Sequence, residues 1–150
     1  MHYYKSATTD HLQSVNFLPD KTLTKITDLI NSYLSNLNLT KGYLLHGDIS
    51  LEHIYKVSGD TYFIDFENCT SGDPLFDIAI FDFYNNYKYP TKNYTDLFLK
   101  GYNSQVNYKT ITLYKLINAI KKSSDRIKSN RLNTIHKVKR LIVKYFYELS

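Results

Sequence analysis

Acidic residues and histidines are concentrated between residues 46 and 77 of this 150-residue chain. They occur in three short segments: His46-Gly47-Asp48-Ile49-Ser50-Leu51-Glu52-His53, Ile64-Asp65-Phe66-Glu67 and Gly72-Asp73-Pro74-Leu75-Phe76-Asp77. Between the first two segments, two β-rich runs flank Ser58-Gly59-Asp60, a pattern that predicts a hairpin. A hairpin brings its two ends together, so we expect Asp65 to return close to the loop after Asp48. Two carboxylates beside a common space can orient a hydroxyl group or hold a divalent cation.

In this order and at this spacing, the three segments resemble the signature HGDxxxxN…IDFE…GDPxxDLA of aminoglycoside phosphotransferases and related small-molecule kinases. The resemblance implies a protein-kinase-like fold that transfers the γ-phosphate of ATP or GTP to a hydroxyl group of a small molecule, an antibiotic or a metabolite, with Mg²⁺. It further implies that Asp48 is the catalytic base and that Asp65 binds the Mg²⁺. Phosphoryl transfer suits such residues, because it requires mainly an oriented hydroxyl group and cations on the phosphate oxygens.

Position 53 departs from the commonest pattern of this superfamily, which has Asn there as the second metal ligand. The residue is His53, as in macrolide kinases and certain aminoglycoside kinases, and imidazole is a poorer Mg²⁺ ligand than an amide oxygen. His53 could ligate the metal, hydrogen-bond a phosphate or only pack at the start of a strand, and we expect it to share the Mg²⁺ and its nucleotide with Asp65. If His53 does not ligate, metal binding depends on Asp65 and water.

The remaining polar residues of the three segments are expected to support the site. Gly47 permits tight backbone geometry, and His46 is interpreted as structural, through a bond to nearby backbone, rather than as catalytic. Glu67 either assists through a metal-bound water or is a structural or solvated carboxylate. Asp73 and Asp77 stand around the start of a predicted helix, where carboxylates accept free amides and favour the helix dipole. The resemblance to kinase-like folds implies that they support the catalytic loop.

The elements that position these residues are mostly helical. Apolar residues at steps of three and four predict helices from residue 20 to about 37, over 75–87 and 94–103, around 111–120 and over 132–149. A short strand is predicted at residues 43–45. We therefore expect an α+β fold, mainly helical, that resembles the C-terminal lobe of a kinase with a small β-hairpin. Residues 1–18 are interpreted as a polar leader or linker, and residues 19–150 as the lobe.

The groups that hold a triphosphate in kinases are missing from this sequence. It has no Walker motif or Gly-rich loop, and Gly42 is the only glycine before the first segment. The resemblance thus covers the C-terminal lobe, and we expect the nucleotide-binding lobe to be absent from the chain. Three explanations stay open: a truncated or split gene product, a partner that supplies the lobe in trans, or a protein that has lost catalysis.

The net charge of +5 is unevenly distributed along the chain. Residues 1–104 contain 8 Lys or Arg and 12 Asp or Glu, a net charge of −4, whereas residues 105–150 contain 11 and 2, a net charge of +9. The basic segment is either a set of solvated helix faces or a surface for an anionic partner. The resemblance implies that an acceptor pocket would lie largely on the C-terminal helices, so for an enzyme the charge of this segment argues against a polycationic antibiotic and for a neutral or anionic hydroxyl acceptor.

A second function therefore stays open, a non-catalytic binding module that docks an anionic partner such as nucleic acid. Its candidate basic residues are Lys121, Lys122, Arg126, Lys128, Arg131, Lys137, Lys139, Arg140 and Lys144. Interleaved tyrosines could stack on bases, but Tyr114 and Tyr145 fall on apolar helix faces, and no nucleic-acid-binding motif is recognised.

Cysteine content and hydropathy favour a cytoplasmic protein without a membrane partner. The single cysteine, Cys69, permits no internal disulfide, which is typical of a reduced compartment. No apolar run approaches the roughly 18 residues that a membrane-spanning helix needs.

Overall fold

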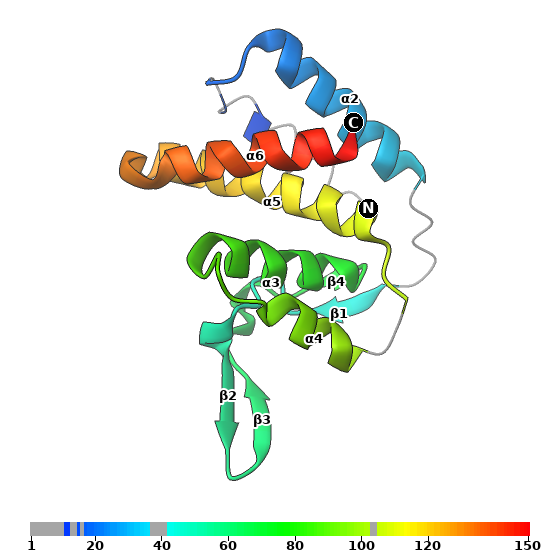
Figure 1. Ribbon diagram of the computed structural model, residues 1–150, viewed down its shortest axis with the longest axis vertical. Coiled ribbons are helices and arrows are strands. Elements are labelled where there is room, and N and C mark those ends of the chain that lie inside the picture. Colours follow the sequence, from blue (N-terminus) through cyan, green and yellow to red (C-terminus); the bar gives the residue numbers. More distant parts are fainter. Residues whose placement is uncertain (1–10, 13–14, 16, 37–41, 103–104) are drawn as a thin grey trace. The chain divides into compact units, whose positions relative to one another are not determined.

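The computed structural model describes residues 11–12, 15, 17–36, 42–102 and 105–150. The chain forms two compact units (Figure 1): the first comprises residues 1–38 and 108–150, and the second comprises residues 39–107. The predicted boundary between a leader and a lobe at residue 18 stays a prediction, because most of that segment lies outside the described residues.

The first unit is helical. Its long elements are α2 (Asp20–Asn36), α5 (Tyr108–Lys128) and α6 (Ile135–Leu149), with a single 3₁₀ turn (Leu132–Thr134) before α6. Helix α5 packs against both α6 and α2. Helix α6 buries Val138, Ile142, Tyr145 and Leu149 at steps of four, three and four, so the periodicity that predicted this helix reflects a real buried stripe.

The second unit carries all the described strands and two helices. Its elements are β1 (Tyr43–Leu45), β2 (Ile54–Val57), β3 (Asp60–Phe63), β4 (Thr70–Gly72), α3 (Leu75–Lys88) and α4 (Tyr94–Tyr102), with 3₁₀ turns at Leu51–His53 and Phe66–Asn68. Strand β1 pairs with β4, and β2 pairs with β3, both antiparallel. The combination of small antiparallel sheets with dominant helix confirms the predicted α+β class.

The β2–β3 hairpin forms where the sequence predicted it. Ser58 and Gly59 form its two-residue loop, and both have positive φ angles, 51° and 98°. Such a loop matches the right-handed twist of the flanking strands. The register pairs Ile54 with Phe63 and Val57 with Asp60. Strand β3 ends at Phe63, so Asp65 lies two residues beyond the hairpin and does not close its second strand.

Helix α3 anchors the second unit. Six apolar side chains and Asn85 are buried along it, so it presents few solvent-facing positions. Helix α4 packs on it through Phe98, whose ring lies 4.6 Å from that of Phe81. The Thr95 hydroxyl donates a hydrogen bond of 2.7 Å to Asp82 at the same contact.

In the part of the chain that the structure describes, every helix is too short or too polar to cross a membrane.

Candidate functional site

The loop that follows β1, residues 46–50, is called the Asp48 loop here, and helix α3 holds its backbone. The amide of His46 donates to Oδ2 of Asp77 at 2.7 Å, and the amide of Gly47 donates to Oδ1 at 2.9 Å. One carboxylate from the first turn of α3 thus satisfies two consecutive amides. Asp77 therefore fixes the direction in which the chain leaves β1, and hydrogen bonds to a charged group are stronger than neutral ones.

Gly47 cannot be replaced by a larger residue without moving the backbone. Its φ angle is +81°, which L-residues rarely adopt. A Cβ atom at this position would lie 2.1 Å from the carbonyl oxygen of Asn68. The Asp48 loop and the 3₁₀ turn after the hairpin therefore pass each other at backbone contact distance.

His46 is buried, with 5% of its surface exposed, and connects this loop to the end of the hairpin. Its Nε2 lies 2.8 Å from the carbonyl oxygen of Ile64, and because a carbonyl only accepts, the ring nitrogen donates. The ring packs against Phe66, with centroids 4.6 Å apart, and stacks on His53 at 5.6 Å. This backbone contact is of the kind that the sequence interpretation expected for a structural His46.

Asp65 is presented to the site by an extension of the hairpin ladder. The amide of Ile64 donates to the carbonyl of His53 at 3.1 Å, so residue 64 lies opposite residue 53 beyond the ends of β2 and β3. Asp65 then adopts the left-handed conformation, with φ 66° and ψ 59°. A non-glycine residue holds this conformation at some energetic cost, and such residues concentrate at functional sites. At Asp65 the chain therefore turns away from the direction of β3.

His53 lies between Asp48 and Asp65. Its Nδ1 lies 2.8 Å from the carbonyl oxygen of Asp48, so Nδ1 carries the proton. Its Nε2 faces Oδ2 of Asp65 at 3.6 Å. In the neutral ring Nε2 is then a lone-pair donor directed toward a carboxylate. A lone pair and a carboxylate that face each other form a pair suited either to a proton or to a metal cation.

The Asp48 carboxylate makes a contact that the sequence interpretation missed. The hydroxyl of Tyr84, on α3, donates a hydrogen bond of 2.7 Å to Oδ1 of Asp48. The available signal was helical spacing: Tyr84 follows Asp77 by seven residues and so falls on the same face of the helix. With 15 tyrosines in the chain, that spacing alone did not single it out.

Glu52 and Lys88 form a second missed contact between the same two parts of the chain. Lys88 Nζ lies 2.5 Å from Oε2 of Glu52. The hydrogen bond from Lys88, and then its charge, hold the pKa of the Glu52 carboxyl below its usual range. The Glu52 side chain is 59% exposed and that of Lys88 is 31% exposed, so solvent screens the ion pair and it contributes little to stability by itself.

Asp73 and Glu67 differ in their surroundings. Asp73 Oδ1 accepts the amide of Leu75 at 2.9 Å and thereby caps the start of α3. Glu67 is exposed, and the side-chain amide of Asn68 lies 3.5 Å from its Oε1. The two alternatives for Glu67, metal-bound water or solvated carboxylate, both stay open.

The described residues include no group of three or more His, Cys, Asp or Glu side chains arranged to hold a metal. Two such side chains, those of His53 and Asp65, face each other at 3.6 Å and form a candidate site for a divalent cation. Mg²⁺ in phosphotransferases commonly takes only one or two protein carboxylates and completes its shell with phosphate and water. Asp65 fits this donor set, and the imidazole of His53 is the less suited of the two ligands.

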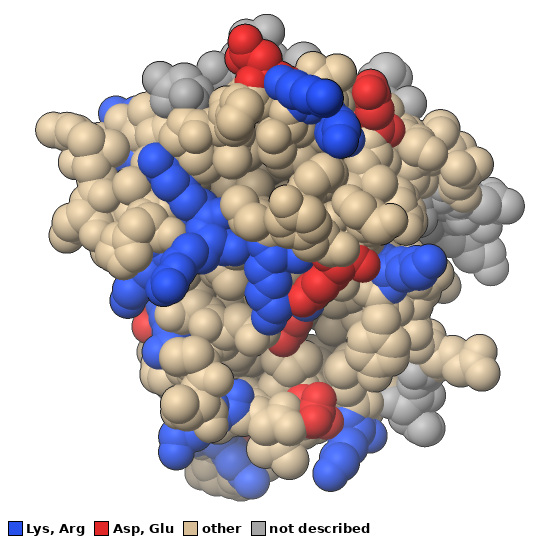
Figure 2. All heavy atoms as spheres, turned by 45° about the horizontal axis from the view of Figure 1, so that its top comes forward, with Lys and Arg blue, Asp and Glu red and all other residues tan. Residues whose placement is uncertain are grey.

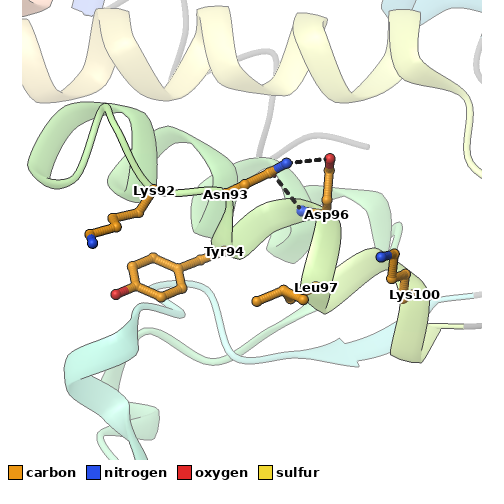
Figure 3. A pocket seen from close by; sticks show the side chains of 6 residues that line it. All are labelled: Lys92, Asn93, Tyr94, Asp96, Leu97 and Lys100. Carbon is orange, nitrogen blue, oxygen red and sulfur yellow. Dashed lines mark hydrogen bonds between the residues drawn. The ribbon is translucent and has the colours of Figure 1, made fainter.

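A shallow hollow of about 400 Å³ lies over the start of α4 (Figure 3). Lys92, Asn93, Tyr94, Asp96, Leu97 and Lys100 line it. The side-chain amide of Asn93 donates to Oδ2 of Asp96 at 2.6 Å, and the backbone amide of Asp96 donates to Oδ1 of Asn93 at 3.4 Å. This polar pair therefore caps the start of α4. The sequence interpretation did not mark this hollow.

Residues 4–107 match the phosphotransferase enzyme family (APH). No curated protein sequence matches the chain. Solved structures of this fold do match the chain, at sequence identities of 11% to 19%.

The chain superposes on a thermostable mutant of aminoglycoside phosphotransferase APH(4)-Ia with a TM-score of 0.70 and 11% identity, covering 87% of this chain and 46% of that one. For the choline kinase LicA from Streptococcus pneumoniae the values are 0.71, 17%, 97% and 55%. For the amicoumacin kinase hAmiN, in complex with AMP-PNP and Ca²⁺, they are 0.61, 19%, 93% and 47%. The chain thus spans about half the length of the solved structures it matches.

These matches confirm two expectations from the sequence. The motif order in residues 46–77 correctly indicated the family, and the fold is that of protein-kinase-like phosphotransferases.

Proposed function

Because the chain belongs to the phosphotransferase enzyme family, we propose that it forms the catalytic half of a small-molecule kinase. Such an enzyme transfers the γ-phosphate of ATP to a hydroxyl group of its acceptor. The observation that carries the proposal is His53, which contacts the backbone of Asp48 with one nitrogen and faces Asp65 with the other. One ring therefore brings the two carboxylate-bearing loops together.

Asp48 is the proposed base. Its carboxylate orients the acceptor hydroxyl and takes its proton as the acceptor oxygen bonds to the γ-phosphorus and the bond to the leaving ADP oxygen breaks. The side chain is partly exposed, so an acceptor can approach it. The amides held by Asp77 keep the loop in place while this happens.

Asp65 and His53 are the proposed ligands of Mg²⁺. When bound, this cation would neutralise charge on the phosphate oxygens. Asp65 contributes a hard oxygen ligand, and the proton held on Nδ1 of His53 leaves Nε2 free of hydrogen for ligation.

A nucleotide-binding lobe outside these 150 residues is the proposed source of the remaining triphosphate contacts. Large side chains of β1 and the hairpin support this, because they are exposed although apolar or aromatic. They are Tyr43, Leu44, Tyr55, Val57, Tyr62 and Phe63. Apolar exposure on paired strands such as β2 and β3 is typical of surfaces that meet another part of a protein.

The test measures acceptor-dependent phosphorylation by mass spectrometry. The intact protein is assayed together with its nucleotide-binding lobe, and neutral, anionic and cationic alcohols are offered as acceptors. We expect Asp48→Asn to lower turnover about 100- to 10,000-fold. Asp60→Asn, in the exposed hairpin loop region, is the matched control and should retain activity. Turnover that is equal in the two variants would contradict the assignment of Asp48.

A second function, the docking of an anionic partner, is favoured by one specific observation. The outer face of α6 exposes Lys137, Arg140 and Lys144 at steps of three and four. Figure 2 shows a face of the molecule on which Lys and Arg side chains gather with fewer carboxylates among them. Several basic residues of this unit also make contacts within it: Arg126 donates to Thr134 at 2.9 Å, Lys139 lies 4.1 Å above the ring of Phe17, and Lys144 Nζ lies 3.7 Å from Oε1 of Glu148.

Retention on immobilised RNA, measured against salt, tests this second function. Binding of basic residues to RNA phosphates releases counterions, so the affinity falls steeply as the salt concentration rises. The double variant Arg140→Glu, Lys144→Glu should elute earlier than Lys21→Glu, Lys25→Glu, which changes the same charge on exposed positions of α2. Equal retention of both variants would leave the basic residues of α6 as ordinary solvated side chains.

A further inference from the structure

Three polar side chains on one face of α3 contact the segment that carries Asp48. Asp77, Tyr84 and Lys88 are separated by seven and four residues, the spacing of a single helix face. Asp77 accepts the first two amides of the Asp48 loop, Tyr84 reaches the carboxylate of Asp48, and Lys88 reaches Glu52. The helix thus meets residues 46–52 at three successive points.

The contact of Tyr84 is to the reacting carboxylate itself. Its hydroxyl lies 2.7 Å from Oδ1 of Asp48, a distance typical of a good hydroxyl–carboxylate hydrogen bond. An Asp side chain has two rotatable bonds, and its terminal torsion is broad. A donor on one oxygen therefore fixes the plane of the carboxylate and the direction in which the other oxygen points.

Lys88 holds the Tyr84 ring in turn. Its Nζ lies 5.4 Å from the ring centroid, within the range of a cation–π contact, and it is bonded to Glu52 at 2.5 Å. Tyr84 is only partly buried, whereas its neighbours Phe83 and Asn85 are buried. The ring is thus directed to Asp48 by its hydroxyl and by Lys88 rather than by complete burial in an apolar core.

We infer that Tyr84 is a positioning residue for the proposed phosphoryl transfer. It sets the orientation of the Asp48 carboxylate toward the acceptor hydroxyl, and Lys88 with Glu52 keeps its ring in place. This inference rests on the proposed function of Asp48. Because Tyr84 acts through the base and not on the nucleotide, its hydroxyl should matter for the chemical step and little for nucleotide binding.

The kinetic test compares Tyr84→Phe, which removes only the hydroxyl, with Tyr89→Phe, a neighbouring and partly exposed tyrosine at the end of the same helix. We expect kcat of Tyr84→Phe to fall about 10- to 100-fold, with KM for ATP changed less than about twofold. Tyr89→Phe should match the wild type in both constants. An unchanged kcat in Tyr84→Phe, or a loss confined to KM, would overturn the inference.

A spectroscopic test does not depend on turnover or on the folding of a Tyr84 variant. In the wild-type protein, the hydrogen bond should slow exchange of the Tyr84 hydroxyl proton enough to give a proton NMR signal, and Asp48→Ala should remove that signal. A Tyr84 hydroxyl that exchanges as fast as that of Tyr89 would overturn the inference. Absence of phosphoryl transfer in the wild type, with the signal present, would instead contradict the proposed function.

Discussion

The Asp48 loop and the β2–β3 hairpin are close in sequence but are held in different ways. Side chains from α3 and the 3₁₀ turn at residues 66–68 restrain the loop at its amides, at Gly47 and at the Asp48 carboxylate. The hairpin is held by the backbone hydrogen bonds between its own two strands. Its cross-strand pair Tyr55 and Tyr62 is half exposed, because each residue has a relative exposure of 51%.

This difference separates two roles within one unit. The residues of the Asp48 loop, where the base is proposed, are fixed by several contacts that are distant in sequence, which is what preorganisation of a site requires. The hairpin needs only to return the chain so that Ile64 lies opposite His53. Substitutions should therefore be costly in the loop and mild in the hairpin.

The largest expected effect is that of Gly47→Ala. The new methyl group would meet the Asn68 carbonyl and the backbone would be strained at positive φ, so we expect the free energy of unfolding to fall by roughly 3–5 kcal/mol in urea denaturation. Gly59→Ala is the matched control, because Gly59 has φ +98° but open space around it. It should cost only about 1–2 kcal/mol. Equal losses would remove the contrast between loop and hairpin.

Asp77→Ala should have the next largest effect. It leaves the amides of His46 and Gly47 without their acceptor, and we expect a loss of about 2–3 kcal/mol. Hydrogen exchange should show both amides opening faster, and Asp77→Asn, which retains one acceptor oxygen, should fall between Ala and wild type. If the exchange rates of these two amides do not change in Asp77→Ala, then α3 does not hold the loop.

Tyr62→Ala should have the smallest effect. The side chain pairs with Tyr55 across the hairpin and is half exposed, so its loss should cost about 0.5–1 kcal/mol in the free energy of unfolding. A loss of several kcal/mol would show that the hairpin is packed and not merely paired.

Local patterns predicted much of this fold, because local forces dominate there. Residues Ile26, Ile30 and Leu34 are buried on α2 at the spacing that predicted the helix. The hairpin followed from Ser58 and Gly59, whose conformation requires positive φ. Motif order indicated the family, and the structure brings His53 beside both Asp48 and Asp65. The catalytic and metal-binding roles of these residues stay predictions.

Long-range contacts were not predictable in the same way. Strand β4, of sequence Thr-Ser-Gly, lacks apolar alternation and exists because it pairs with β1. The contact of Tyr84 with Asp48 joins residues that are 36 positions apart. The left-handed conformation of Asp65 also left no signal, because a glycine would be the usual marker of such a position.

The proposed cation site at His53 and Asp65 is tested most directly by the paramagnetic broadening that bound Mn²⁺ causes. Titration of the isotope-labelled protein should broaden the amide signals of residues 53 and 65 first, and Asp65→Asn should abolish this selectivity. Asp60→Asn, which removes an exposed carboxylate of the hairpin, should leave it unchanged. Broadening that spreads equally over exposed carboxylates, or that survives Asp65→Asn, would contradict the account.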